Sequence, residues 1–168
     1  TFGARNDNAA FAEHFRKFYA EVFFPYLKEN GIKTILHLGD LTDRRKYINY
    51  ITAKNLEDQF VKVCHDEGIE LHIIAGNHDC YYKNTNDVNS LNQLYSNSKY
   101  DNMNMYWNEP VELDFDGCRI MLSPWICKSN YESSMDAFRD TSAQILMGHF
   151  EISGYEMMKG QLCEDGLD

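Results

Sequence analysis

Two short polar turns, each beginning with glycine and each placed directly after an apolar run, constrain this chain most strongly. The run 35–38 leads into GDLTD at residues 39–43, and the run 71–75 leads into GNHD at residues 76–79. A glycine at the end of a buried strand lets the chain turn sharply. In open α/β sheets the carboxyl ends of the strands form the edge where ligands bind. We therefore expect the two turns to form one site.

The segments between these turns have the apolar spacing of helices. Residues 9–29 and 48–67 carry apolar side chains at every third or fourth position, as a buried helix face requires. We expect Pro25 to end or kink the first helix, and Gly31 and Gly68 to stop the two helices. The alternation of helix and strand predicts an α/β fold with parallel strands and right-handed crossovers.

The second half of the chain has weaker patterns. Residues 83–104 are rich in Asn, Ser, Asp and Lys, which predicts a long loop with a short helix near residues 91–95. Asp116-Gly117 is a strong hairpin signal between two apolar runs. The remaining expected elements are strands at 111–115 and 118–123, a helix at 131–140 and a strand at 143–147 that ends in Gly148-His149. No linker or repeat divides the sequence, so we expect one domain over residues 1–168.

Composition narrows the class of protein. The 168 residues include 43% hydrophobic residues and carry a net charge of -10, so neither global disorder nor a generally basic DNA-coating protein is expected. The five cysteines form no C-x-x-C pair, which argues against a zinc ribbon and suits a reducing compartment. No segment has the length of a membrane span or the pattern of a signal peptide. We expect a cytoplasmic protein without a membrane partner.

Three side chains at the strand ends are candidate metal ligands. Asp40 offers a carboxylate that can bridge two ions, Asn77 an amide oxygen and His149 an imidazole nitrogen. Such mixed O and N donors suit Mn, Fe or Zn without choosing among them. Two divalent metals roughly 3.5–4 Å apart activate a water and neutralise a phosphoryl oxygen. This pattern therefore predicts phosphoester hydrolysis.

Neighbouring residues extend the candidate site. His78 is placed to protonate the leaving alkoxide, and Asp79 to hold its ring by a hydrogen bond. Asp43 is a candidate supporting residue. The cations Arg44, Arg45 and Lys46 either contact a DNA phosphate backbone or form an ordinary solvated face, and the sequence leaves both interpretations open.

The three motifs in this order resemble the calcineurin-like metallophosphoesterase superfamily, and within it the SbcD-like nuclease subunits of DNA repair and recombination. Phage recombination endonuclease subunits are the most similar branch. Further similar stretches are residues 71–79, Tyr82-Lys83-Asn84, residues 114–118, Pro124-Trp125 and residues 148–151.

The resemblance implies a fold and an activity. The fold is a β-sandwich flanked by helices and built from βαβ units. Asp40 is then the metal-bridging carboxylate, Asn77 and His149 bind one of two manganese ions, and His78 with Asp79 is catalytic. The implied protein is a DNA exonuclease and endonuclease that forms a homodimer and works with a coiled-coil ATPase subunit of the SbcC type.

Two family motifs are absent from this sequence. The opening Asp-x-His and the closing Gly-His-x-His do not occur among the 168 residues. We therefore expect a domain that is truncated at both ends. Because both metal ions lack ligands, we expect this stretch alone to bind metal weakly and to be poorly active.

Two alternatives remain at the level of sequence. One is a phosphatase or small phosphodiesterase of the same superfamily, although Arg45 and Asp79 stand where those enzymes usually have Gly and Glu. The other is a scaffold that keeps the fold without catalysis, supported only by the two absent motifs.

Overall fold

The computed structural model describes residues 1–97, 100–164 and 166–167. Its helical segments are α1 (Ala4–Asp7), α2 (Ala9–Phe18), η1 (Tyr19–Phe23), α3 (Phe24–Glu29), α4 (Tyr50–Leu56), η2 (Glu57–Val61), α5 (Lys62–Asp66), α6 (Ser90–Tyr95) and α7 (Tyr131–Asp140). Its strands are β1 (Thr34–His37), β2 (Glu70–Ile74), β3 (Met103–Tyr106), β4 (Val111–Phe115), β5 (Cys118–Ser123), β6 (Ile145–Gly148), β7 (Glu156–Met158) and β8 (Gln161–Leu162).

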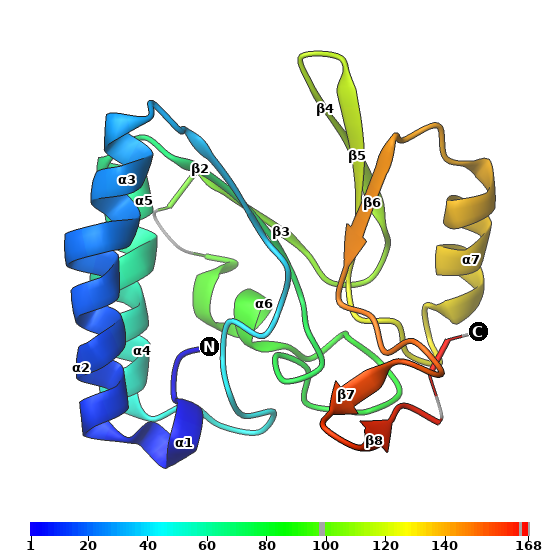
Figure 1. Ribbon diagram of the computed structural model, residues 1–168, viewed down its shortest axis with the longest axis horizontal. Coiled ribbons are helices and arrows are strands. Elements are labelled where there is room, and N and C mark those ends of the chain that lie inside the picture. The colour runs from blue at the N-terminus through cyan, green and yellow to red at the C-terminus, as the bar shows by residue number, and fades with distance from the viewer. Residues whose placement is uncertain (98–99, 165, 168) are drawn as a thin grey trace.

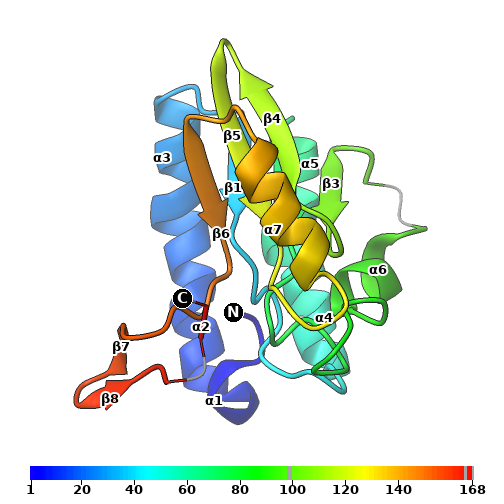
Figure 2. The same cartoon turned by 90° about the vertical axis from the view of Figure 1, so that its right-hand side faces the viewer.

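These elements form a layered sandwich. The long helices α2–α3 and α4–α5 lie side by side over one face of the sheet β1-β2-β3 (Figure 1). The sheet β4-β5-β6 lies beyond it, and α7 covers the outer side of that second sheet (Figure 2). The arrangement confirms the expected α/β fold with two sheets flanked by helices.

The first sheet is the centre of the sandwich because its two faces are both apolar. β2 pairs in parallel with β1 and with β3, as expected for the βαβ alternation. Side chains alternate along a strand, so Ile35 and Ile73 pack in the core under the helices. Leu36 and Ile74 point the other way and pack against the second sheet.

The hairpin was correctly placed by its turn residues. β4 and β5 are antiparallel, and Asp116 and Gly117 at the turn have φ angles of 53° and 89°. Two positive φ angles give the turn whose twist matches a hairpin. β5 also pairs in parallel with β6, which carries the chain to Gly148 and His149.

The first helical segment keeps its expected range, residues 9–29. Pro25 does not end it, because the widened turn η1 precedes it and Pro25 lies in the first turn of α3, where a missing N–H costs least. β3 was missed by the sequence analysis: it begins inside the segment expected to be a loop, residues 83–104, and extends past it to Tyr106. Its sequence MNMY gave little apolar signal, and it forms a strand by pairing with β2.

Candidate metal centre

The turns after β1 and β2 pack backbone against backbone. A Cβ atom at Gly76 would lie 2.3 Å from the backbone nitrogen of Asp40, and one at Gly39 would lie 2.8 Å from the Cα of Gly76. Only glycine fits at either position. Asp40 itself has a φ of 53°, in the left-handed region that Asp tolerates better than most residues. The sequence-based expectation that the two turns meet is therefore confirmed.

Three electron-pair donors converge above this contact. The Nε2 atom of His149 lies 3.3 Å from Oδ1 of Asn77 and 3.6 Å from Oδ1 of Asp40. The same Asp40 oxygen accepts a 2.9 Å hydrogen bond from the backbone N–H of His78. Asp40 and Asn77 follow strands of the first sheet, whereas His149 follows β6 of the second. The structure thus brings together the three predicted ligand residues.

The hydrogen bonds around the three donors suit a cation. The Nδ1 atom of His149 lies 2.9 Å from the backbone carbonyl of Leu38. Because that oxygen can only accept, we assign the ring proton to Nδ1, which leaves the Nε2 lone pair facing the other donors. Asn77 donates through Nδ2 to Glu151, at 3.4 Å, so its oxygen also faces inward. Three lone-pair donors facing one another fit a divalent cation.

The ring of His78 is exposed beside these donors, and it is held by a main-chain atom. Its Nδ1 atom lies 2.5 Å from the carbonyl oxygen of Asp43. Nδ1 therefore carries the proton that is shared with this oxygen, and Nε2 is left for an external partner. Asp43 contacts His78 through its backbone carbonyl, and a supporting role of Asp43 in the site stays a prediction.

Asp79 has a different role from the one the sequence suggested. Its carboxylate is 1% exposed and accepts hydrogen bonds from the backbone N–H groups of Gly76, Leu41 and Thr42 at 2.9–3.2 Å. The hydroxyl group of Ser90 donates a further bond. Burial raises the pKa of Asp79, and the backbone N–H donors oppose that shift. Asp79 therefore ties the two turns together, and the expectation that it holds the ring of His78 was wrong.

The three cations after Asp43 are not equivalent. Arg44 forms a 2.6 Å ion pair with Asp7, and its side chain is 19% exposed. Arg45 donates to the backbone carbonyls of Cys80 and Tyr82 and lies over the ring of Trp125. Lys46 is exposed. The side chains of Arg44 and Arg45 are thus both engaged in contacts within the protein. Contact of any of the three cations with DNA stays a prediction.

A comparison with models of known protein families shows to which family this chain belongs. The model of the calcineurin-like phosphoesterases matches residues 7–167. The chain belongs to this family. It is also 39% identical over 135 residues to exonuclease subunit 1 of Enterobacteria phage T4. That similarity covers 80% of this chain and 39% of the phage protein, so the chain spans about two fifths of that relative.

Calcineurin-like phosphoesterases use divalent metals, and the site of this chain fits that requirement. Within the described residues no group of three or more His, Cys, Asp or Glu side chains is placed to hold an ion. The convergence consists of one carboxylate, one imidazole and one amide, so it is recognised only when the amide of Asn77 is counted as a ligand.

Glu151 was not identified from the sequence as a candidate site residue. It was noted only as part of a similar stretch, and its contact with Asn77 crosses 74 positions of sequence. Glu151 also lines, with His149 and Trp125, a cleft of about 510 Å³ that opens beside the donors. Its place two residues after His149 was the one available signal.

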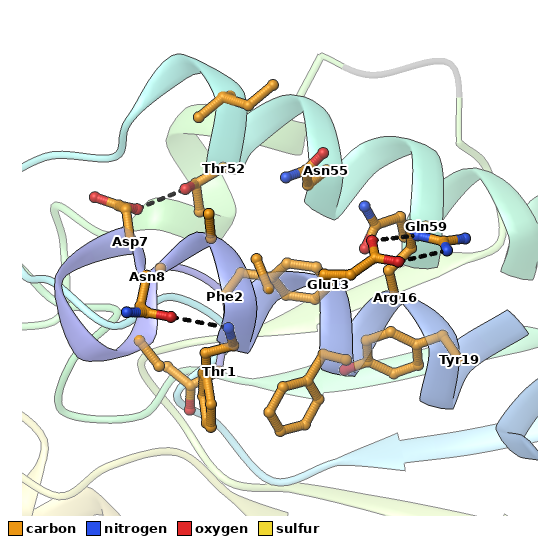
Figure 3. A pocket seen from close by; sticks show the side chains of 17 residues that line it. Thr1, Phe2, Asp7, Asn8, Glu13, Arg16, Tyr19, Thr52, Asn55 and Gln59 are labelled. Atoms are coloured by element: carbon orange, nitrogen blue, oxygen red, sulfur yellow. Dashed lines mark hydrogen bonds and ion pairs between the residues drawn. The ribbon is translucent and has the colours of Figure 1, made fainter.

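A second hollow lies elsewhere, between the N-terminal segment, α2 and α4. This pocket of about 260 Å³ is lined by aromatic rings and by polar side chains, with Asp7 bonded to Thr52 at one end and Glu13 paired with Arg16 at the other (Figure 3). None of the candidate ligands lines it. Among the described residues, no helix is long and apolar enough to span a bilayer.

Proposed function

We propose that this calcineurin-like phosphoesterase chain is the nuclease part of a metal-dependent enzyme that hydrolyses DNA phosphodiesters. The observation that carries the proposal is the convergence of Asp40, Asn77 and His149 with the exposed ring of His78 beside them. The similarity to a phage protein named as an exonuclease subunit supports DNA as the substrate.

Two manganese ions are the proposed cofactors: Asp40 would be the carboxylate shared by both, and Asn77 and His149 would help to hold one of them. Metal ions held by such ligands supply an activated water and neutralise charge on the phosphoryl oxygens. Oxygen and imidazole donors favour Mn²⁺ over metals that thiolates select. Ligands beyond these three complete the site in the proposed enzyme.

The proton of the leaving group comes from His78 in this proposal. The carbonyl of Asp43 holds Nδ1–H, so the ring presents Nε2 outward. In its imidazolium form the ring also carries a proton on Nε2, which passes to the departing alkoxide and leaves the neutral ring with its remaining proton on Nδ1. The backbone N–H of His78 is bonded to Asp40, which keeps the acid and the bridging carboxylate in one fixed relation. Asp79 supports both residues indirectly, because its carboxylate accepts hydrogen bonds from the backbone of the two turns that carry them.

We further propose that the enzyme is a homodimer and that it works with a coiled-coil ATPase subunit of the SbcC type, on DNA in the cytoplasm of the cell or of the phage host. The word subunit in the relative's name supports a partner. Among the three cations after Asp43, the exposed Lys46 is the best placed to contact a phosphate.

The first prediction tests the acid. In the full-length protein encoded by the gene, His78→Ala should reduce hydrolysis of linear duplex DNA by about 100-fold or more, as the loss of a general acid does. Mn²⁺ binding, measured by titration calorimetry, should stay nearly unchanged. Asp40→Ala should abolish both. Exposed His65 on α5 gives the control His65→Ala, which should keep both.

Substrate choice distinguishes the alternatives. The same preparation should be given duplex DNA, a phosphopeptide and a nitrophenyl phosphodiester in Mn²⁺. Preference for the phosphopeptide would establish the phosphatase instead, and full-length protein that binds no Mn²⁺ would establish the scaffold. Wild-type cleavage of DNA by the His78 variant would remove its proposed role.

A further inference from the structure

Four exposed side chains form a band beside His78. The tyrosine strip, as we name it, consists of Lys46, Tyr47, Tyr81 and Tyr82. The three tyrosines are 62%, 38% and 49% exposed. Large aromatic side chains on the surface are common singly, but a group of them calls for a partner.

The strip is held in place by protein contacts. Its residues come from two loops, one after β1 and one after β2, which Arg45 joins by hydrogen bonds to the carbonyls of Cys80 and Tyr82 at 3.3 and 3.2 Å. The rings of Tyr81 and Tyr82 meet edge to face, with centroids 4.7 Å apart. The backbone N–H of Tyr81 is bonded to Val88 at 2.8 Å. Little ordering is therefore left for a ligand to induce.

Cations alternate with the rings. The Nζ atom of Lys46 lies 5.7 Å from the centroid of the Tyr81 ring, and the guanidinium of Arg44 lies 5.0 Å from that of Tyr47. Because Arg44 is already paired with Asp7, the exposed Lys46 is the cation of the strip that can attract an anion in a chain with a net charge of -10. Interleaved aromatic rings and cations are the pattern that binds single-stranded nucleic acid, because bases stack on the rings while cations contact phosphates.

The strip begins at the candidate acid. Tyr81 follows His78 by three residues, and the ring of His78 is bonded to Asp43, three residues before Lys46. Both loops of the strip thus start at the two turns that carry Asp40 and Asn77.

We propose that the tyrosine strip binds unpaired nucleotides of a DNA strand next to the bond to be cleaved, with bases stacked on Tyr81 and Tyr82 and a phosphate on Lys46. The inference rests on the proposed function and deepens it, because it names single-stranded DNA as the form of substrate held beside His78. Duplex DNA, whose bases are stacked on one another, has no ring faces to offer to these tyrosines.

The test measures binding apart from cleavage. Fluorescence anisotropy with a labelled oligothymidine and with an abasic oligomer of equal length is recorded in chelator, so that no hydrolysis occurs. Wild-type full-length protein should bind oligothymidine more tightly. Replacing Tyr81 and Tyr82 together by Ala should weaken that binding about 10-fold or more and bring it near the abasic value.

The control is Tyr26→Ala, because Tyr26 on α3 is 58% exposed and lies outside the strip. It should leave both affinities unchanged, and far-UV circular dichroism should show all variants folded. Equal affinity of wild type for the two oligomers, or unaltered oligothymidine binding by the double variant, overturns the proposal. Failure of the proposed function is separate, since it would appear as absent DNA hydrolysis in Mn²⁺ while the base-dependent binding and its loss remain.

Discussion

At the scale of single residues, the orientation of one amide decides whether the site can hold a cation. Asn77 presents its oxygen to His149 because its Nδ2 donates to Glu151. A flipped amide would present N–H groups, which repel a cation. We therefore infer that Glu151 is a positioning residue that acts through Asn77.

Substitution of Glu151 tests this role. Glu151→Ala should weaken Mn²⁺ binding by about 10-fold, in the range found when a partner of a ligand is lost. Glu151→Gln should retain most of the affinity, because the Gln oxygen still accepts from Nδ2 of Asn77. Titration calorimetry on full-length protein measures both. Equal losses for Ala and Gln would instead point to the charge of Glu151.

The residue scale is also where sequence reasoning reached its limit. The convergence of the candidate ligands Asp40, Asn77 and His149 was predictable because each follows a strand-like run and a glycine. The partners of Asp79 and Arg44 were not, since a hydrogen bond to Thr42 and an ion pair with Asp7 depend on contacts 37 positions apart. A sequence pattern shows which groups exist, and only the packed chain shows which of them meet.

At the scale of elements, the contact between the turns after β1 and β2 sets the geometry of the site. A side chain at Gly76 would displace Asp40, because its Cβ would lie 2.3 Å from both the nitrogen and Oδ1 of that residue. The strand ends cannot separate without also breaking the bonds that Asp79 makes to both turns.

Gly76→Ala should therefore destabilise the fold by about 3 kcal/mol or more, as overpacking against backbone does, and should lower Mn²⁺ affinity. Gly68→Ala is the matched control, because Gly68 has a φ of +63° with nothing within 4 Å of its added Cβ. Its cost should be only about 1–2 kcal/mol of backbone strain. Urea unfolding measures the two values, and similar costs for both would contradict the steric argument.

Elements with a strong period or a strong turn signal were predictable, and those that depend on pairing were not. The helix at residues 131–140 and the Asp116-Gly117 hairpin were found because periodicity and turn chemistry are local. β3 and the small hairpin of β7 and β8 have short sequences without alternation, and neighbouring strands make them extended.

At the scale of the whole molecule, the seam between the helical layer and the first sheet contains a titratable group. The ring of His37 lies 6.1 Å from that of Phe60, and burial lowers its pKa from 6.5 to about 4. The unfolded chain therefore binds a proton near pH 6 that the folded chain does not. Stability should fall as the pH decreases from about 6.5 toward 4.

His37→Leu should remove this contribution. Urea unfolding between pH 7 and pH 4 should show the wild type losing up to about 3 kcal/mol more than the variant, the equivalent of the pKa difference. Parallel curves for the two proteins over that range would show that His37 is protonated alike in both states.

The placement of the donors on both halves of the sandwich has one more consequence. Asp40 and Asn77 follow strands of the first sheet and His149 follows the second, so a bound cation would add a link between two halves that also meet through apolar side chains and through the 2.8 Å hydrogen bond from the N–H of Trp125 to the carbonyl of Ala75. Any sliding of one sheet over the other would change the coordination distances at once. The affinity for the ion therefore depends on how the two sheets are packed against each other. Mutations in the apolar contact between the sheets should change the metal affinity even though they lie away from the ligands.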